Sequence, residues 1–284
     1  MPALFGPAGN SESFSKKYKS STDAPQFIKE LGIDAYEYQC GKGVRVSDKT
    51  ASALCENAEK FGIKLSLHAP YFISLSSVEK EKRDNSINYI LQSAEAAMKI
   101  GADRIVIHSG SCAKMTREEA LELAKDTLIR AREEVVSKGL ERIHFCPETM
   151  GKVNQLGNLE EVLELCALDD TFIPCIDFGH LNARTFGGIK GKTEYEEILD
   201  KIENKLGSDR LKVFHSHFSK IMFTDPGGEK KHLTFDDNQG FGPDYEPLME
   251  LVAKKNLSPT FICESAGTQA EDALTMKMYY QSVL

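Results

Sequence analysis

Short apolar runs alternate with longer amphipathic segments along the whole chain. The longer segments repeat apolar residues at intervals of three and four, as residues 78–101 and 116–139 do, and both of these end on glycine. Thr116 followed by Glu119 adds a helix-capping pattern at the start of the second segment. Strand-like apolar runs lie at residues 2–6, 33–40, 63–69, 103–109, 142–148, 172–177, 211–218 and 260–264.

Eight strands that alternate with helices predict a single (β/α)8 barrel, which we expect to occupy residues 1–284 as one domain. An open, doubly wound parallel sheet is the structural alternative. Such a sheet requires a glycine-rich phosphate loop after its first strand, and the segment "GPAGN" at residues 6–10 does not match GxGxxG. The barrel is therefore the fold that we expect.

The composition is ordinary for a globular protein, with 41% hydrophobic and 27% charged residues. A net charge of −8 argues against indiscriminate binding to nucleic acid or to anionic membranes, although it leaves room for a local basic groove. The seven cysteines are widely spaced and contain no CxxC pair, which indicates free thiols of a reducing compartment. We find no signal peptide and no membrane span, and we expect a cytoplasmic protein.

Polar residues end six successive strands of the predicted barrel. Active sites of such barrels lie at these carboxyl ends, so the side chains should meet at one mouth. A single strand-end histidine is usually a hydrogen-bonded structural residue, but six populated strand ends favour a functional site. The residues are His68, His108, Glu148, Asp177 with His180, the pair His215 and His217, and Glu264.

Three carboxylates and several imidazoles at one mouth point to metal ions. Buried carboxylates without compensating charge are costly, and divalent cations remove that cost. Histidine and carboxylate ligands without thiolate suit Zn²⁺ or Mn²⁺. The number of candidate ligands indicates two or three ions, with Glu148 placed to bridge two of them. Clustered metals of this kind are the usual apparatus for phosphoester hydrolysis.

The segment "LKVFHSHFSKI" at residues 211–221 places two histidines on the same side of one strand. Either both are hydrogen-bonded core residues or the strand contributes to a metal site. His144 precedes Glu148 by four residues on the same face, and we interpret it as structural.

Together, the stretches "LSLHAPY", "VIHSG", "ETMGKVNQLGNLEE", "CIDFGH", "HSHFSK" and "ICES" resemble the endonuclease IV family, the family-2 apurinic/apyrimidinic endonucleases. The resemblance implies a zinc-dependent enzyme that cuts the phosphodiester 5′ to an abasic site in damaged DNA, with Glu148 or Glu264 orienting the attacking water. It implies that Glu148, Asp177, His215 and Glu264 hold one metal, that His68 and His108 hold a second bridged by Glu148, and that His180 and His232 hold a third.

The chain departs from the family pattern before His232. The family has an aspartate two residues before this histidine, where Lys230 stands here, and Glu229 lies one residue further back. Either Glu229 substitutes through a local shift, or the third site is weak and the cluster is binuclear. Lys230 is a candidate contact for a substrate phosphate, with a solvated loop as the alternative.

A second departure concerns DNA. The loop after the second strand, "CGKGVRVSDKT", is short and supplies Lys42 and Arg45 as candidate substrate contacts but no aromatic side chain. Because phosphate contacts dominate affinity for DNA, so few cations predict weak and salt-sensitive binding. The resemblance assigns the metal to His215, so we expect His217 to face the substrate or to support the ligands.

Two other functions remain open. A sugar isomerase or epimerase with one Mn²⁺ or similar ion requires only Glu148, Asp177, His215 and Glu264, with the two glutamates moving protons beside a carbonyl. The additional histidines at 68, 108, 180 and 232 favour the nuclease. A barrel that binds metal or a partner without catalysis is the third possibility. No membrane or protein partner is implied.

Overall fold

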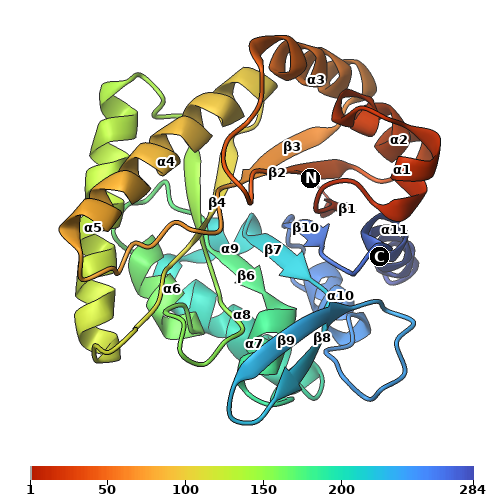
Figure 1. Ribbon diagram of the computed structural model, residues 1–284. Coiled ribbons are helices and arrows are strands. Elements are labelled where there is room, and N and C mark those ends of the chain that lie inside the picture. Colours follow the sequence, from red (N-terminus) through yellow and green to blue (C-terminus); the bar gives the residue numbers. More distant parts are fainter. Residues whose placement is uncertain (1) are drawn as a thin grey trace.

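The eight strands of the barrel run parallel and follow one another around it in chain order (Figure 1). The structure is a computed structural model that describes residues 2–284. The strands are β1 (Leu4–Pro7), β2 (Ala35–Gln39), β3 (Lys64–His68), β4 (Arg104–His108), β5 (His144–Glu148), β6 (Cys175–Asp177), β7 (His215–Phe218) and β10 (Thr260–Cys263).

The barrel closes where its first and second strands meet. The backbone N–H of Asp34 donates to Phe5 O at 2.8 Å, and that of Gly9 donates to Glu37 O at 2.9 Å. A single parallel bridge joins Ala8 to Glu37 in the same place. These bonds satisfy backbone groups that would otherwise form two open edges.

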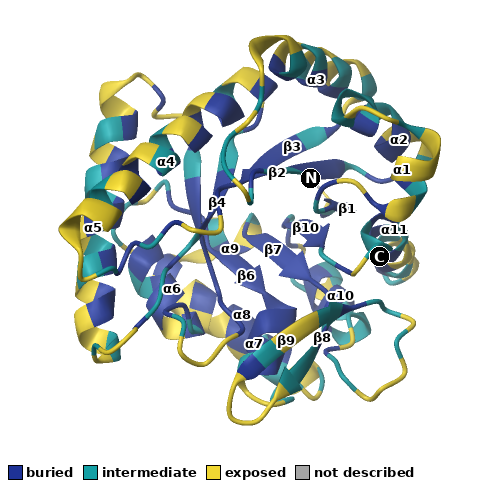
Figure 2. Ribbon diagram, viewed as in Figure 1, coloured by how far each residue is buried: buried dark blue, intermediate teal, exposed yellow. Residues whose placement is uncertain are grey.

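Helices surround the strands, and the main core lies between the two layers (Figure 2). They are α1 (Glu12–Lys17), the 3₁₀ turn η1 (Ser21–Asp23), α2 (Ala24–Leu31), α3 (Asp48–Phe61), α4 (Lys80–Ile100), α5 (Arg117–Ser137), α6 (Leu159–Cys166), α7 (Phe178–Arg184), α8 (Lys192–Leu206), α9 (Ser208–Lys212), α10 (Glu246–Lys254) and α11 (Gln269–Ser282). The capping box predicted at Thr116 and Glu119 is present at the start of α5.

The inside of the barrel holds its own layers of side chains. Val106, Cys146 and Cys175 form a small apolar cluster with Ile173. Each of the three lies two residues before a polar strand end, so this cluster is the layer directly beneath the mouth. On these three strands the layer directly beneath the polar strand ends is therefore apolar.

The predicted barrel and all eight of its strands are confirmed, and three local features differ. Residues 211–212 belong to α9 rather than to the seventh strand. The short helix α7 follows β6 directly, with the Asp177 side chain accepting the backbone N–H of His180 at its start. An antiparallel hairpin, β8 (Lys220–Thr224) and β9 (Gly228–Leu233), lies between the last two strands of the barrel.

Two further features concern residues 2–284. All seven cysteines are free, and all but Cys55 are buried. No helix in this range combines the length and apolar character that crossing a membrane requires.

Candidate metal centre

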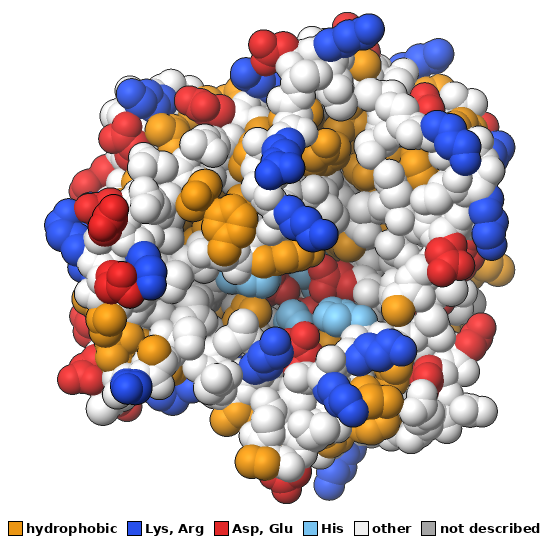
Figure 3. Space-filling model, in the orientation of Figure 1, with side chains coloured by type: hydrophobic (Ala, Val, Ile, Leu, Met, Phe, Trp, Pro, Cys, Tyr) orange, Lys and Arg blue, Asp and Glu red, His pale blue; other side chains and the backbone are white. Residues whose placement is uncertain are grey.

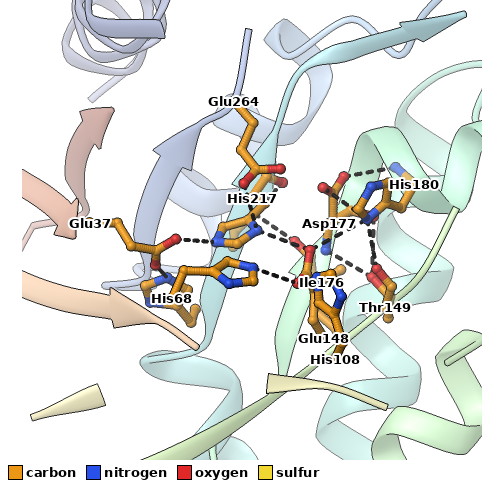
Figure 4. A network of polar contacts seen from close by, with 12 residues as sticks. Glu37, His68, His108, Glu148, Thr149, Ile176, Asp177, His180, His217 and Glu264 are labelled. Atoms are coloured by element: carbon orange, nitrogen blue, oxygen red, sulfur yellow. Dashed lines mark hydrogen bonds and ion pairs between the residues drawn. The ribbon is translucent and has the colours of Figure 1, made fainter. Parts of the chain in front are cut away.

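Glu148 lies at the centre of the mouth, with imidazoles from four different elements around it (Figure 4). His68 Nε2 and His108 Nε2 each lie 3.3 Å from its Oε2. His217 Nδ1 and His180 Nδ1 lie 3.0 Å and 3.4 Å from its Oε1. The carboxylate is therefore shared by groups on both of its sides, as a ligand that bridges two ions would be.

Two of these imidazoles are held by a backbone carbonyl through Nδ1 and present Nε2. His68 Nδ1 lies 2.8 Å from Ala69 O, and His180 Nδ1 lies 2.9 Å from Thr149 O. A neutral imidazole that donates to a carbonyl has its lone pair on the other nitrogen, which here is Nε2. The backbone thus directs Nε2 of both rings into the mouth.

His217 rather than His215 lies in the upper layer, whereas we expected His215 to be the metal ligand of the seventh strand. The strand register pairs His217 with Asp177 and His215 with Cys175. The two histidines share one side of β7, so alternation could not distinguish them, and only the register of the neighbouring strands sets their depth. His217 Nδ1 lies 3.5 Å from Glu264 Oε1 as well as near Glu148.

His215 lies one layer deeper, where its Nε2 is 3.0 Å from Glu37 Oε2. Cys175 lies within reach of both histidines, and the three could form a group of metal-ligand atoms. Burial raises the pKa of the Cys175 thiol well above its ordinary value, so it stays protonated at neutral pH. A protonated thiol is a poor metal ligand, so we do not assign an ion to this deeper group. His215 and Glu37 are both 0% exposed and form the floor of the site.

Glu229 joins His180 and His232 in a second group of ligand atoms near the first. His180 Nε2 lies 3.5 Å from Glu229 Oε2, and His232 Nε2 lies 3.9 Å from Glu229 Oε1. Met222 pairs with Lys231 and Phe223 pairs with Glu229, so Lys230 is an extra residue in β9. This β-bulge turns Glu229 and His232 to the same side although three positions separate them.

Two glycines let the hairpin approach closely enough to bring Glu229 into the site. The backbone N–H of Glu229 donates to Gly151 O at 3.1 Å. A Cβ on Gly151 would lie 2.6 Å from Glu229 Cβ and 2.8 Å from His180 Cδ2. Gly228 has φ +80° and faces the same backbone, so a larger residue fits at neither position.

The charges of the site are strongly coupled. Burial would raise the pKa of Glu148, but the facing imidazoles of His217 and His108 hold it well below its ordinary value. Burial opposes protonation of His180, yet Asp177 and Glu148 outweigh it and raise its pKa to about 10. Burial and the neighbouring carboxylates raise the pKa of Asp177 itself. Without metal, protons on the imidazoles compensate the clustered carboxylates.

The residues fit divalent cations. Glu148, Asp177, His217 and Glu264 offer ligand atoms that all lie within 4.8 Å of one another, and His68, Glu148 and His217 form an overlapping set. Within residues 2–284, Asp177 Oδ2 is buried and accepts no hydrogen bond, and its one charged neighbour among the imidazoles is His180 Nδ1, at 3.1 Å. A buried carboxylate oxygen without a hydrogen bond, beside other carboxylates, is a suitable ligand for a cation. Nitrogen and oxygen ligands at the mouth suit Zn²⁺ or Mn²⁺.

The site opens into a cavity of about 480 Å³. Figure 3 shows histidines and acidic side chains at the bottom of this hollow, with Lys and Arg side chains on both sides of it. Lys152 and Tyr71 line the cavity, whereas Lys42, Arg45 and Lys230 do not line it. The Tyr71 ring stacks against His108 with centroids 5.4 Å apart.

Three residues in or beneath the site were not predicted from the sequence: Glu37, Tyr71 and Lys152. Glu37 stands inside a strand-like run, and a charged residue at an inward position of such a run was the available signal. Tyr71 and Lys152 follow His68 and Glu148 by three and four residues, in the loops that extend the strand ends. His144, which we interpreted as structural, lies 2.7 Å from Thr171 O through Nδ1, outside the groups of ligand atoms.

Two known proteins are similar to this chain in sequence. An uncharacterized protein of Methanocaldococcus jannaschii, MJ0133, is 33% identical over 97% of this chain and 96% of its own length. A probable endonuclease 4 of Mycoplasma pneumoniae is 32% identical over 80% of this chain and 73% of its own.

Two solved structures share the fold. A D-tagatose 3-epimerase-like protein superposes with a TM-score of 0.73 at 20% identity, over 99% of this chain and 98% of its own. Endonuclease IV of Thermus thermophilus gives a TM-score of 0.67 at 19% identity, over 92% and 94%. The family model described as xylose isomerase-like TIM barrel matches residues 25–278. The chain therefore belongs to the xylose isomerase-like TIM barrel family.

Proposed function

We propose that this protein is a metal-dependent phosphodiesterase of the endonuclease IV type that cleaves DNA 5′ to abasic sites. The observation that carries the proposal is the second group of ligand atoms, His180, Glu229 and His232, beside the group around Glu148. The single-metal sugar isomerase that is the alternative would require only the group around Glu148. The similarity to probable endonuclease 4 proteins supports the same choice.

The ligand set that we propose differs from the one implied by family resemblance at two positions. Glu148, Asp177, His217 and Glu264 would hold one ion, His68 and His108 a second with Glu148 between them, and His180, Glu229 and His232 a third. The bulge at Lys230 allows Glu229 to take the place of the aspartate that the family has two residues before the last histidine. Zn²⁺ is the ion that we expect, with two or three per chain.

When bound, such ions supply a nucleophile at neutral pH and stabilise charge on the phosphate. The protein's own groups divide the remaining work. Glu148 is 1% exposed and is surrounded by imidazoles, so it organises the ligands. The Glu264 side chain is 15% exposed at the cavity and is the carboxylate that can reach and orient a water molecule. His232, held by Ser219 Oγ at 2.9 Å, faces the same opening.

Substrate contacts would come from the rim. Lys152 lines the cavity and would meet a phosphate oxygen, and Lys42, Arg45 and the bulge residue Lys230 are further candidates outside the cavity lining. Tyr71 is 53% exposed and offers a flat ring to a base or sugar. This small number of cations predicts binding that salt weakens strongly.

The test is cleavage of an oligonucleotide duplex with one abasic site, combined with elemental analysis of the purified protein. We expect incision 5′ to the site and two to three zinc ions per chain. One manganese ion per chain, no incision and turnover of ketoses would instead establish the sugar isomerase, for which the group around Glu148 alone would suffice.

A further inference from the structure

We propose that Glu37, on the floor of the barrel, selects the nitrogen of His217 that binds metal and is therefore a positioning residue of the centre. The inference rests on the proposed function only in that the site holds metal ions. It concerns a residue outside the mouth, because Glu37 does not line the cavity and is 0% exposed.

Three hydrogen-bonding groups and one ion-pair contact, from His217, surround the Glu37 carboxylate. Oε1 lies 3.0 Å from His217 Nε2 and 3.1 Å from Gln39 Nε2. Oε2 lies 3.0 Å from His215 Nε2 and 2.9 Å from Ser66 Oγ. A fully buried carboxylate with every oxygen engaged is fixed in place, since any rotation would leave donors unpaired. Figure 4 shows it on the side of His217 opposite to Glu148.

This contact decides the tautomer of His217. His217 Nε2 lies 3.0 Å from Glu37 Oε1 as an ion-pair contact and makes no hydrogen bond with the described residues. An unprotonated, electron-rich nitrogen at this distance from a carboxylate oxygen is repelled, whereas a protonated one is attracted. The proton therefore stays on Nε2, and Nδ1 is the nitrogen directed at Glu148 and Glu264, at 3.0 Å and 3.5 Å. His68 and His180 have the opposite arrangement, because backbone carbonyls hold their Nδ1 atoms.

A carboxylate is a stronger anchor than a carbonyl. It makes the imidazole a more basic ligand and restricts rotation of the ring, which strengthens metal binding. His217 is thus a ligand of the group around Glu148 whose ring contacts a buried carboxylate that is itself held by hydrogen bonds. Its metal-binding nitrogen follows from the position of Glu37.

The role of His215 follows from the same contact. Its Nδ1 is buried and has no hydrogen-bond partner, a cost that the fold tolerates while Nε2 holds Glu37. The two inward histidines of β7 therefore act together. His217 would bind the metal, and His215 holds Glu37, which orients His217.

The first test needs no variant. Long-range ¹H–¹⁵N correlation spectra of the zinc-loaded protein report which nitrogen of His217 carries the proton. We expect a protonated Nε2 and a metal-bound Nδ1. A zinc-bound Nε2, or absence of His217 from the zinc ligands, would overturn the proposal.

The second test measures zinc affinity by competition with a chromophoric chelator. Glu37→Gln places an amide N–H₂ group beside one of the histidines. We therefore expect the zinc ion that His217 holds to bind about 10- to 100-fold less tightly. Ser66→Ala removes one donor but keeps the carboxylate and should cause a smaller loss. Thermal melts of both metal-free variants check that the barrel is folded.

Unchanged zinc affinity in a folded Glu37→Gln protein, or equal losses in both variants, would contradict the proposal. These readouts do not involve DNA. A wild-type protein that binds zinc through His217 Nδ1 but cuts no abasic duplex would therefore refute the proposed nuclease and leave the role of Glu37 standing.

Discussion

His217 Nδ1 lies 3.0 Å from Glu148 Oε1, so the outer histidine of the pair on β7 meets the carboxylate that four imidazoles share. The inner histidine is turned to Glu37 instead. The division of roles within two residues of one strand follows from depth in the barrel alone.

The two histidines should therefore respond differently to substitution. His217→Ala removes a ligand atom, and we expect loss of one metal ion per chain and a fall in activity larger than about 100-fold. His215→Gln should keep the metal count and lower metal affinity only moderately. Elemental analysis and competition titrations of both variants check this, and loss of an ion in His215→Gln alone would restore the original assignment.

The bulge in β9 allows a sharp test of the second group of ligand atoms, His180, Glu229 and His232. Glu229→Ala should lose one metal ion per chain, whereas Lys230→Ala should lose none. Deleting Lys230 removes the bulge and places the glutamate two residues before the histidine in a regular ladder, where both still face the site. We expect this deletion to keep the metal count, and retention of the full count in Glu229→Ala would contradict the assignment.

Glu161 predicts an acid dependence of stability away from the metal groups. Burial would raise its pKa, but Arg117 and the backbone N–H groups of Gly157 and Asn158 hold it below the ordinary value. A carboxyl with a lowered folded-state pKa stabilises the protein above its unfolded pKa of about 4.3, and this is lost as pH falls through the folded value.

Glu161→Gln should therefore cost about 1.5–3 kcal/mol near pH 7, the range for a hydrogen bond to a charged group. The difference from wild type should shrink as pH falls below about 4.3. Urea unfolding of the two proteins across this range measures it. A difference that stays constant with pH would show that the charge of Glu161 contributes nothing.

Lys152 predicts the salt dependence of DNA binding. Lys152→Ala should weaken binding of an abasic duplex and reduce the slope of log affinity against log salt by about 0.9, the value for one lost phosphate contact. Lys205→Ala, on the outer helix α8, is the matched control and should leave the slope unchanged. Fluorescence anisotropy measures both, and equal slopes in the two variants would remove Lys152 from the DNA contact.

The eight strands could be predicted because each is a short apolar run between amphipathic helices, and the polar strand ends identified the mouth. Which histidine of "HSH" lies beside Glu148 could not be predicted. His215 and His217 face the same side of the strand and differ only in depth, which is set by the pairing of β7 with β6 and β10. Glu37 was hidden inside a strand. The reach of Glu229 depends on a bulge and on the close approach of Gly151, which are tertiary features.

The central claim is that the group around Glu148 hydrolyses abasic DNA with bound metal. Its most direct test is incision of an abasic duplex by zinc-loaded wild-type protein and by Glu148→Gln, with Glu133→Gln on the outer helix α5 as the matched control. We predict incision by the wild type and the control, and none by a folded Glu148→Gln protein. Incision by Glu148→Gln at the wild-type rate, or none by the zinc-loaded wild type, would contradict the account.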